Sequence, residues 1–163
     1  TLLPSNLKFK LFIIGSPGSD FGLSKTETDY YAGIVESAKQ INDRVIFTGF
    51  VKNDQIPGFL AASDISVIPS LYEEPGALTI FENLAAGLPI VTTDSGGTPE
   101  YITNECAFII RRDQDFVHNL SSTLRELIVS EEKRVAMGSA GYIHVQQFNY
   151  NKYYEDLLTI LTR

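Results

Sequence analysis

The chain has 163 residues, of which 44% are hydrophobic and 20% are charged, and its formal net charge is −7 at pH 7. This composition is typical of a soluble globular protein and excludes a largely disordered chain, while the negative charge argues against broad electrostatic binding to nucleic acid. A small anion held by local dipoles stays compatible with this charge, and the single cysteine, Cys106, excludes an internal disulfide.

Short apolar runs alternate with longer stretches of helical spacing along the chain. The apolar runs predict strands at 9–15, 45–50, 65–70, 89–94 and 107–112, and the helical spacing predicts helices at 26–41, 53–63, 76–87, 113–130, 131–147 and 151–162. The first four strands are nearly continuous apolar stretches, as expected of parallel strands covered on both faces. The alternation predicts an α/β fold, a Rossmann-like doubly wound parallel sheet with additional C-terminal helices. Without a repeat or a linker, we expect a single domain over residues 1–163.

In such sheets, ligands bind beyond the carboxyl ends of the strands, where loops lead into helix N-termini. The loops at these places are 15–22, 50–54, 70–76 and 94–100, and they are rich in glycine, proline and acidic residues. The first contains neither GxGxxG nor a P-loop GK[ST] and does not support the use of nicotinamide or ATP. In the second, Phe50 or Val51 could lie against a nucleobase, although an aromatic residue at a strand end is more often part of the core.

The third loop predicts an anion site. Pro75 and Gly76 precede a helix that we expect to begin near Ala77. The first N–H groups of a helix have no partner inside it, and the helix dipole adds partial positive charge there. Such a helix end can hold a diphosphate without any basic side chain, which reconciles phosphate binding with an acidic protein.

Two carboxylates flank this helix start. The helix is expected to bury Leu78, Ile80, Phe81, Leu84 and Ala85, so Glu82 stands out on a mostly apolar segment. A buried Glu82 could accept hydrogen bonds from the hydroxyls of a ribose whose phosphates lie at the helix end. Alternatively, Glu74 caps the helix and Glu82 forms a surface salt bridge, and the local pattern leaves both interpretations open.

The fourth loop contains the pair Gly96 and Gly97. The pair predicts a tight turn in which both residues adopt positive φ. It is equally compatible with a second close approach of the backbone to a ligand, and the two interpretations do not exclude one another.

Few other residues suggest chemistry. His118 and His144 lie in separate helical stretches without a partner at metal-ligand spacing, so we predict no metal site. Arg111 and Arg112 end a strand and are expected to be solvated. No run is long enough for a transmembrane span and the first residues lack the pattern of a signal peptide, so we expect a cytoplasmic protein.

Together, the loops resemble one family. The run SLYEEPGALTIFENLAAGLPIVTTDSGGTPEYI at 70–102 is similar to the C-terminal, donor-binding half of retaining glycosyltransferases of family 4, which have the GT-B fold. Glu74 and Glu82 have the separation of the family's E-x7-E pattern. LFIIGSPG, VIFTGFV and AASDISVIPS upstream and FNYNKYYEDLL downstream also follow the family's order, so the resemblance covers almost the whole chain.

The resemblance implies an enzyme that transfers a sugar from a nucleotide-diphosphate sugar, such as a UDP-sugar or a GDP-sugar, to an acceptor with retained configuration. It implies that Glu74 is the catalytic residue and holds hydroxyls of the transferred sugar, and that Glu82 holds the ribose. The remaining donor-binding candidates are Gly76, Ala77, Leu78, Thr79, Gly15, Ser16, Phe50, Val51, Gly96 and Gly97. The resemblance implies no metal and no cofactor, and polysaccharide biosynthesis is among the roles it suggests.

The sequence departs from the family in two respects. Gly76 and Ala77 stand where the family often has Phe-Gly, and no residues correspond to the family's Arg-x4-Lys pair, which neutralises the diphosphate. We therefore expect this chain to be a fragment of a larger two-domain enzyme whose missing N-terminal domain binds the acceptor. The full-length enzyme is compatible with peripheral membrane association. The fragment alone is expected to transfer no sugar. Alternatives are a nucleotide-sugar epimerase or phosphorylase of the same fold, or a non-catalytic nucleotide-binding or interaction module. The base, the sugar and the acceptor stay open.

Overall fold

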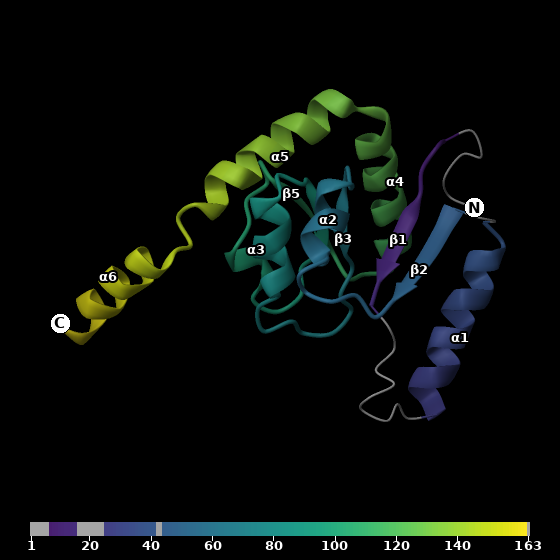
Figure 1. Cartoon of the computed structure of the whole chain (residues 1–163), viewed down its shortest axis with the longest axis horizontal. Coiled ribbons are helices and arrows are strands. Elements are labelled where there is room, and N and C mark those ends of the chain that lie inside the picture. Colours follow the sequence, from purple (N-terminus) through teal and green to yellow (C-terminus); the bar gives the residue numbers. More distant parts are fainter. Residues whose placement is uncertain (1–6, 16–24, 42–43, 163) are drawn as a thin grey trace. The chain divides into compact units, whose positions relative to one another are not determined.

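The computed structural model describes residues 7–15, 25–41 and 44–162 (Figure 1). They divide into two compact units, Asn6–Gly58 and Phe59–Arg163, with α2 (Ile56–Ala61) crossing the boundary in sequence. Each unit has its own parallel sheet.

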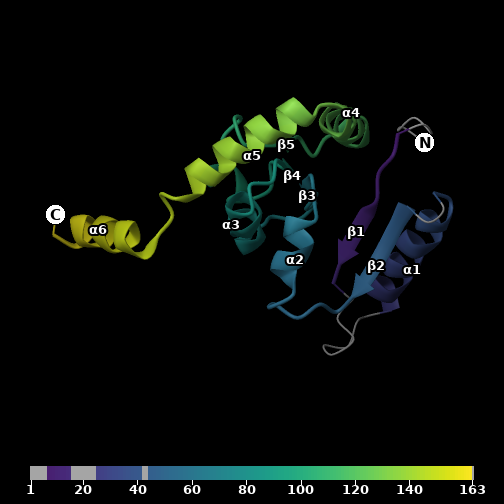
Figure 2. The same cartoon turned by 45° about the horizontal axis from the view of Figure 1, so that its top comes forward.

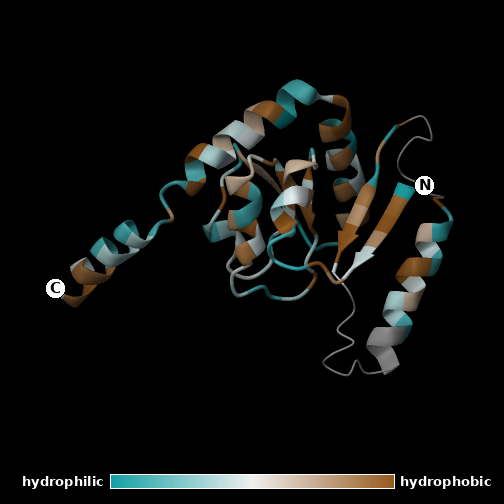
Figure 3. Ribbon diagram, viewed as in Figure 1, coloured by the Kyte–Doolittle hydropathy of each residue, from teal (hydrophilic) through white to brown (hydrophobic). Residues whose placement is uncertain are grey.

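The unit Asn6–Gly58 is a β-α-β motif. Strands β1 (Leu11–Ile14) and β2 (Val45–Gly49) pair in parallel, and α1 (Lys25–Lys39) connects them in sequence, as parallel neighbours require. The ring of Tyr31 on α1 lies edge-on to Phe47 on β2, with the ring centroids 5.9 Å apart. Strand β1 is apolar along its length (Figure 3), yet three of its four residues are exposed. The prediction that this strand is covered on both faces is therefore wrong for the described structure.

The unit Phe59–Arg163 contains three strands in the order β3-β4-β5, all parallel. The strands are β3 (Ser66–Ile68), β4 (Ile90–Thr93) and β5 (Ala107–Ile110). Helix α3 (Leu78–Ala85) connects β3 to β4, and the short 3-10 helix η2 (Thr98–Glu100) lies between β4 and β5. The chain ends with α4 (Phe116–Val129), α5 (Glu131–Val145) and α6 (Tyr150–Leu161).

Two apolar clusters hold this second unit together, and both include residues of β4. Ile90 packs with Ile80 and Leu84 of α3 and with Val145 of α5, whereas Val91 belongs to a cluster with Leu127 of α4. All four residues of β4 are buried, as expected of a central parallel strand. This burial fixes the carboxyl ends of the strands, from which the loops of the candidate site leave.

Helices α3 and α5 lie side by side (Figures 1 and 2), and two glycines lie where the chain at the end of α3 meets α5. Gly87 follows α3 with a φ of +71°, which L side chains rarely adopt. A Cβ on Gly138 of α5 would contact the Gly87 carbonyl oxygen and lie 2.9 Å from its carbonyl carbon. Glycine at position 138 therefore permits direct packing between the backbones of the two helices.

The sequence predicted the class of fold correctly. An α/β arrangement with parallel strands is confirmed, and each predicted strand and helix is present, with bounds that differ from the predicted ones by a few residues. The described strands form two sheets rather than one continuous sheet, and a single domain over 1–163 stays a prediction. Among the described helices, none has the length and apolar character needed to cross a membrane.

Candidate functional site

The start of α3 offers backbone donors that have no hydrogen-bond partner among the residues that the structure describes. Ala77 is the N-cap residue with extended backbone (φ −73°, ψ 104°), and no side chain caps the helix. The N–H of Ile80 donates to Ala77 O at 2.9 Å, whereas the N–H groups of Leu78 and Thr79 precede the first possible intrahelical bond. The predicted helix start near Ala77 is confirmed, and the alternative in which Glu74 caps the helix is wrong.

Glu82 lies on the exposed face of the same helix. Leu78 is 75% exposed, and Glu82, four residues later and therefore one turn along the same face, is also exposed. Ile80 and Leu84 face the core instead. The predicted burial of Leu78 and Ala85 is wrong, and so is the interpretation in which Glu82 is buried, because α3 packs through only one side and the 3.6-residue period turns these positions outward.

The alternative role for Glu82 is not found either. Within the described part of the chain, no salt bridge involves this carboxylate. Glu82 therefore extends the exposed face of α3 that begins at Leu78, next to the start of the helix. This arrangement could receive a ligand that carries both an anionic group and hydroxyl groups.

The Gly96–Gly97 turn packs against the backbone that carries Glu74. The N–H of Gly97 donates to Glu74 O at 2.9 Å. A Cβ on Gly96 would contact Glu74 O and lie 2.8 Å from the Glu74 carbonyl carbon, and one on Gly97 would lie 2.9 Å from Pro75 O. The close approach that these glycines permit is thus one between two backbone segments of the same chain. Only Gly96 has a positive φ, +47°, so the prediction of positive φ is wrong for Gly97, whose φ is −77°.

An arginine at the end of β5 joins the two loops. Arg112 Nη2 donates to Glu73 Oε1 at 2.8 Å, and Arg112 Nε donates to Asp94 Oδ1 at 3.1 Å. The other oxygen of the Glu73 carboxylate accepts from the N–H of Gly96 at 2.6 Å. The prediction that Arg112 is solvated is therefore wrong, whereas Arg111 is exposed as predicted.

These contacts change the acidity of the groups that make them. The hydrogen bond from Arg112, followed by that from the Gly96 N–H, lowers the pKa of Glu73 below its ordinary value. The hydrogen bonds from Arg112 to Glu73 and then Asp94 raise the pKa of the guanidinium. Nearby, the hydrogen bond and negative charge of Glu74 raise the pKa of the exposed Tyr72. Arg112 is thus already paired with two carboxylates, Glu73 and Asp94.

Sequence reasoning missed Arg112, Glu73 and Asp94 as partners. A usable signal existed: β3, β4 and β5 were predicted as consecutive parallel strands, and the carboxyl ends of parallel neighbours meet at one edge of the sheet. Opposite charges at adjacent strand ends, such as Asp94 and Arg112, are therefore candidates for pairing.

The remaining predicted residues belong to the unit Asn6–Gly58. Gly15, with a φ of +118°, donates its N–H to Gly49 O at 3.1 Å, and Ser16 lies outside the described residues. Phe50 is 77% exposed, which contradicts the core alternative, and Val51 is half-buried. Contact between these residues and a ligand on α3 stays a prediction.

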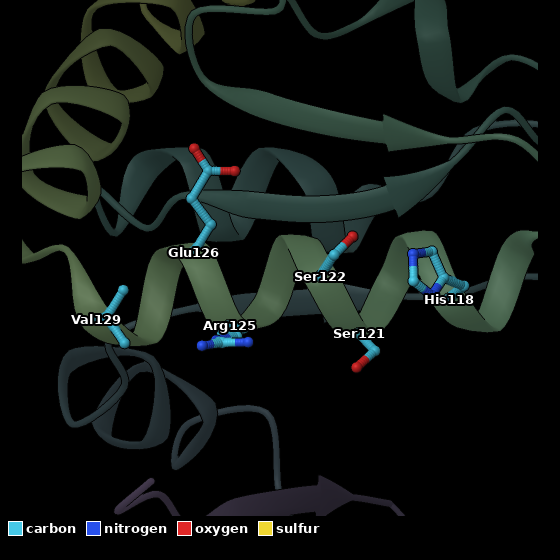
Figure 4. Close-up of a pocket in the computed structure, with 6 residues that line it drawn as sticks. All are labelled: His118, Ser121, Ser122, Arg125, Glu126 and Val129. Carbon is cyan, nitrogen blue, oxygen red and sulfur yellow. The ribbon is translucent and has the colours of Figure 1, made fainter. Parts of the chain in front are cut away.

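A hollow on α4 is unrelated to the predicted residues. It is lined from this helix alone, by His118, Ser121, Ser122, Arg125, Glu126 and Val129 (Figure 4). His144 lies elsewhere, with its Nε2 3.1 Å from Tyr101 O. Over the described residues, no three His, Cys, Asp or Glu side chains gather in a way that could hold a metal ion.

Comparison with known sequences places these features in a family. The profile of the family described as "Glycosyl transferases group 1" matches residues 1–144 of this chain. Spore coat protein SA of Bacillus subtilis is 34% identical over 119 residues, which cover 72% of this chain and 32% of that protein. A GDP-mannose-dependent alpha-(1-6)-phosphatidylinositol monomannoside mannosyltransferase of Mycobacterium tuberculosis is 31% identical over 108 residues, covering 62% of this chain and 28% of that protein. The chain thus spans about a third of the length of these curated relatives.

Comparison with solved structures agrees on the fold. The crystal structure of HepE from Anabaena in complex with UDP-glucose superposes with a TM-score of 0.76 at 23% identity, covering 94% of this chain and 40% of that one. The fold is that of the C-terminal domain of GT-B glycosyltransferases. With a family profile that matches most of its length, the chain belongs to the group 1 glycosyl transferases.

Proposed function

We propose that this chain is the donor-binding part of a retaining glycosyltransferase of family 4, which transfers a sugar from a nucleotide-diphosphate sugar to an acceptor. One observation carries the proposal: α3 begins with N–H groups that have no hydrogen-bond partner among the described residues, and Glu82 is exposed one turn further along the same helix. Family membership supports it, as do two similar proteins, one a GDP-mannose-dependent mannosyltransferase and one solved in complex with UDP-glucose.

The donor would lie along α3. Its phosphates would accept hydrogen bonds from the N–H groups of Gly76, Ala77, Leu78 and Thr79, and its ribose hydroxyls would donate to Glu82. Four residues of helix advance about 6 Å along the axis, a spacing that suits a diphosphate joined to a ribose. Because Glu82 is exposed in the chain alone, its burial would come from the ligand and from the rest of the site.

Glu74 would act at the transferred sugar, where its carboxylate can accept hydrogen bonds from sugar hydroxyls. Cleavage of the glycosyl–phosphate bond leaves negative charge on the diphosphate, and fixed N–H dipoles stabilise charge that develops in the transition state. We therefore expect transfer without a metal or another cofactor. Gly76 would border the sugar together with Tyr101, whose ring and hydroxyl lie 3.7 Å from where a Cβ on Gly76 would be.

The acceptor would be bound by a part of the protein beyond these 163 residues, since the chain spans about a third of its curated relatives. We expect the isolated chain to bind a donor but to transfer no sugar, because orienting an acceptor and excluding water need a closed site.

The test is a binding measurement on the 163-residue chain. A thermal-shift screen with UDP, GDP, ADP, UDP-glucose, GDP-mannose and ADP-glucose identifies the donor, because a ligand that binds only the folded state raises the melting temperature. Glu82→Ala should then weaken binding by about 1–3 kcal/mol. Glu155→Ala, which removes an exposed helical carboxylate from α6, should leave the affinity unchanged. Equal affinity of Glu82→Ala and the unaltered chain would contradict the assignment of Glu82.

A further inference from the structure

Arg112 makes more contacts than the proposed function uses. Beyond its bonds to the carboxylates of Glu73 and Asp94, its guanidinium donates to Asp94 O at 3.1 Å and to Leu71 O at 3.4 Å. Its backbone N–H also donates to Asp94 Oδ1 at 3.2 Å. One side chain at the end of β5 is thus bonded both to the segment that follows β3 and to the residue that follows β4.

These bonds continue directly into the segment that leads to α3. Glu73 is held on one side by Arg112 and on the other by the N–H of Gly96. The next residue, Glu74, is held by the N–H of Gly97. From Leu71 to Glu74, therefore, the chain is fixed on the turn after β4, immediately before the unpaired N–H groups of α3.

The partners of Arg112 indicate that it fixes a conformation rather than filling the core. Its side chain is 23% exposed, whereas the Glu73 side chain is 72% exposed. Screening by water makes such exposed pairs weak contributors to overall stability. The planar fork of N–H donors in a guanidinium nevertheless fixes the direction of its hydrogen bonds to several acceptors, which a flexible ammonium does not.

We propose that Arg112 is a positioning residue for the donor site: it fixes the segment Leu71–Gly76 on the Asp94–Gly97 turn and so determines where Glu74 and the first N–H groups of α3 lie. This proposal rests on the proposed function for its ligand. In this proposal, Arg112 acts through Glu74 and the first N–H groups of α3 and makes no contact of its own with the donor. Without Arg112, the segment would have to be ordered on binding, and this cost appears as lost affinity.

The test compares four forms of the 163-residue chain. Arg112→Gln removes the charge and most of the bonds, and Arg112→Lys keeps the charge but cannot reproduce the fork. The matched control is Arg134→Gln in the same unit: the Arg134 side chain is 19% exposed and donates to Leu127 O at 2.8 Å and Ile128 O at 3.1 Å, away from the two loops. The readouts are the melting temperature, the affinities for UDP-glucose and GDP-mannose, and hydrogen exchange at the N–H groups of Gly96 and Gly97.

We expect both Arg112 variants to weaken donor binding by about threefold to tenfold, the change that follows when one or two groups must be ordered on binding. Exchange at Gly96 and Gly97 should be faster in both. Arg134→Gln should lower the melting temperature without either effect. Full affinity in Arg112→Lys would show that charge alone matters and would overturn the proposal, as would an equal loss of affinity in Arg134→Gln.

The two proposals fail separately. If the unaltered chain binds neither UDP-glucose nor GDP-mannose, the proposed function is contradicted for these donors. The exchange measurement still decides the role of Arg112, since unchanged exchange at Gly96 and Gly97 in Arg112→Gln would overturn it.

Discussion

Gly96→Ala should displace the segment that carries Glu74. The backbone at position 96 has a φ of +47°, and an added Cβ would contact Glu74 O and lie 2.8 Å from both Glu74 N and its carbonyl carbon. These are backbone atoms, so no side chain can rotate away to relieve the contact. Either the turn after β4 or the segment after β3 has to move.

The expected cost has two parts. The left-handed conformation costs a residue with a Cβ about 1–2 kcal/mol, and forcing an extra carbon into a packed site typically costs about 1–3 kcal/mol. Together they predict a loss of about 2–5 kcal/mol in the free energy of unfolding, toward the lower end if the exposed turn yields. Because the movement takes Glu74 with it, donor affinity should fall as well.

Urea unfolding followed by circular dichroism measures the first effect, and a donor titration measures the second. Gly87→Ala is the matched control, since Gly87 also has a positive φ, +71°, but the nearest atom to its Cβ would be Gly138 O at 3.9 Å. It should show the cost of the conformation, about 1–2 kcal/mol, with unchanged donor affinity. Equal stability of Gly96→Ala and Gly87→Ala would refute the reasoning from backbone contact.

Four further substitutions test other parts of the structure. Ser95→Ala should leave the melting temperature unchanged or raise it, because the Ser95 hydroxyl is fully buried and has no hydrogen-bond partner among the described residues; a clear loss would indicate an unseen partner. Gly138→Ala should destabilise the protein by about 1–3 kcal/mol, because the added Cβ separates α3 from α5. Gly33→Ala in α1, where nothing lies near the added Cβ, should stabilise it by up to about 1 kcal/mol. Changes of the same sign in the free energy of unfolding would contradict this packing. Arg112 lowers the pKa of Glu73 despite the opposing charge of Asp94. The difference in the free energy of unfolding between the unaltered chain and Glu73→Gln should therefore be complete above about pH 4.5 and vanish as the pH falls through the lowered pKa of Glu73. A difference that persists in stronger acid would exclude this linkage.

The sequence predicted the elements well because their signals are local. Continuous apolar runs such as the one around Ile90 and helical spacing such as that of α4 depend on few distant contacts. The start of α3 was predictable for the same reason, since Pro75 and Gly76 directly precede an apolar helical pattern.

What the sequence could not predict depends on which faces are covered. The apolar pattern of α3 suggested burial for Leu78, but α3 packs on one side only, so Leu78 and Glu82 are exposed. The bonds of Arg112 join residues up to 41 positions apart in sequence. No local pattern predicts such pairs, and only the predicted order of neighbouring parallel strands indicates them. The sequence predicted only one part of the role of Gly96. Its positive φ followed from the turn, whereas its contact with Glu74 follows from the arrangement of neighbouring strands.

The most direct test of donor binding at the start of α3 is an NMR titration of the 15N-labelled chain with UDP-glucose and, separately, with GDP-mannose. The largest amide shifts should fall on Ala77, Leu78 and Thr79, and Glu82→Ala should reduce the affinity measured at these same signals. Shifts confined to residues outside the loops after β3 and β4, or no shift with either nucleotide sugar, would contradict donor binding at this helix.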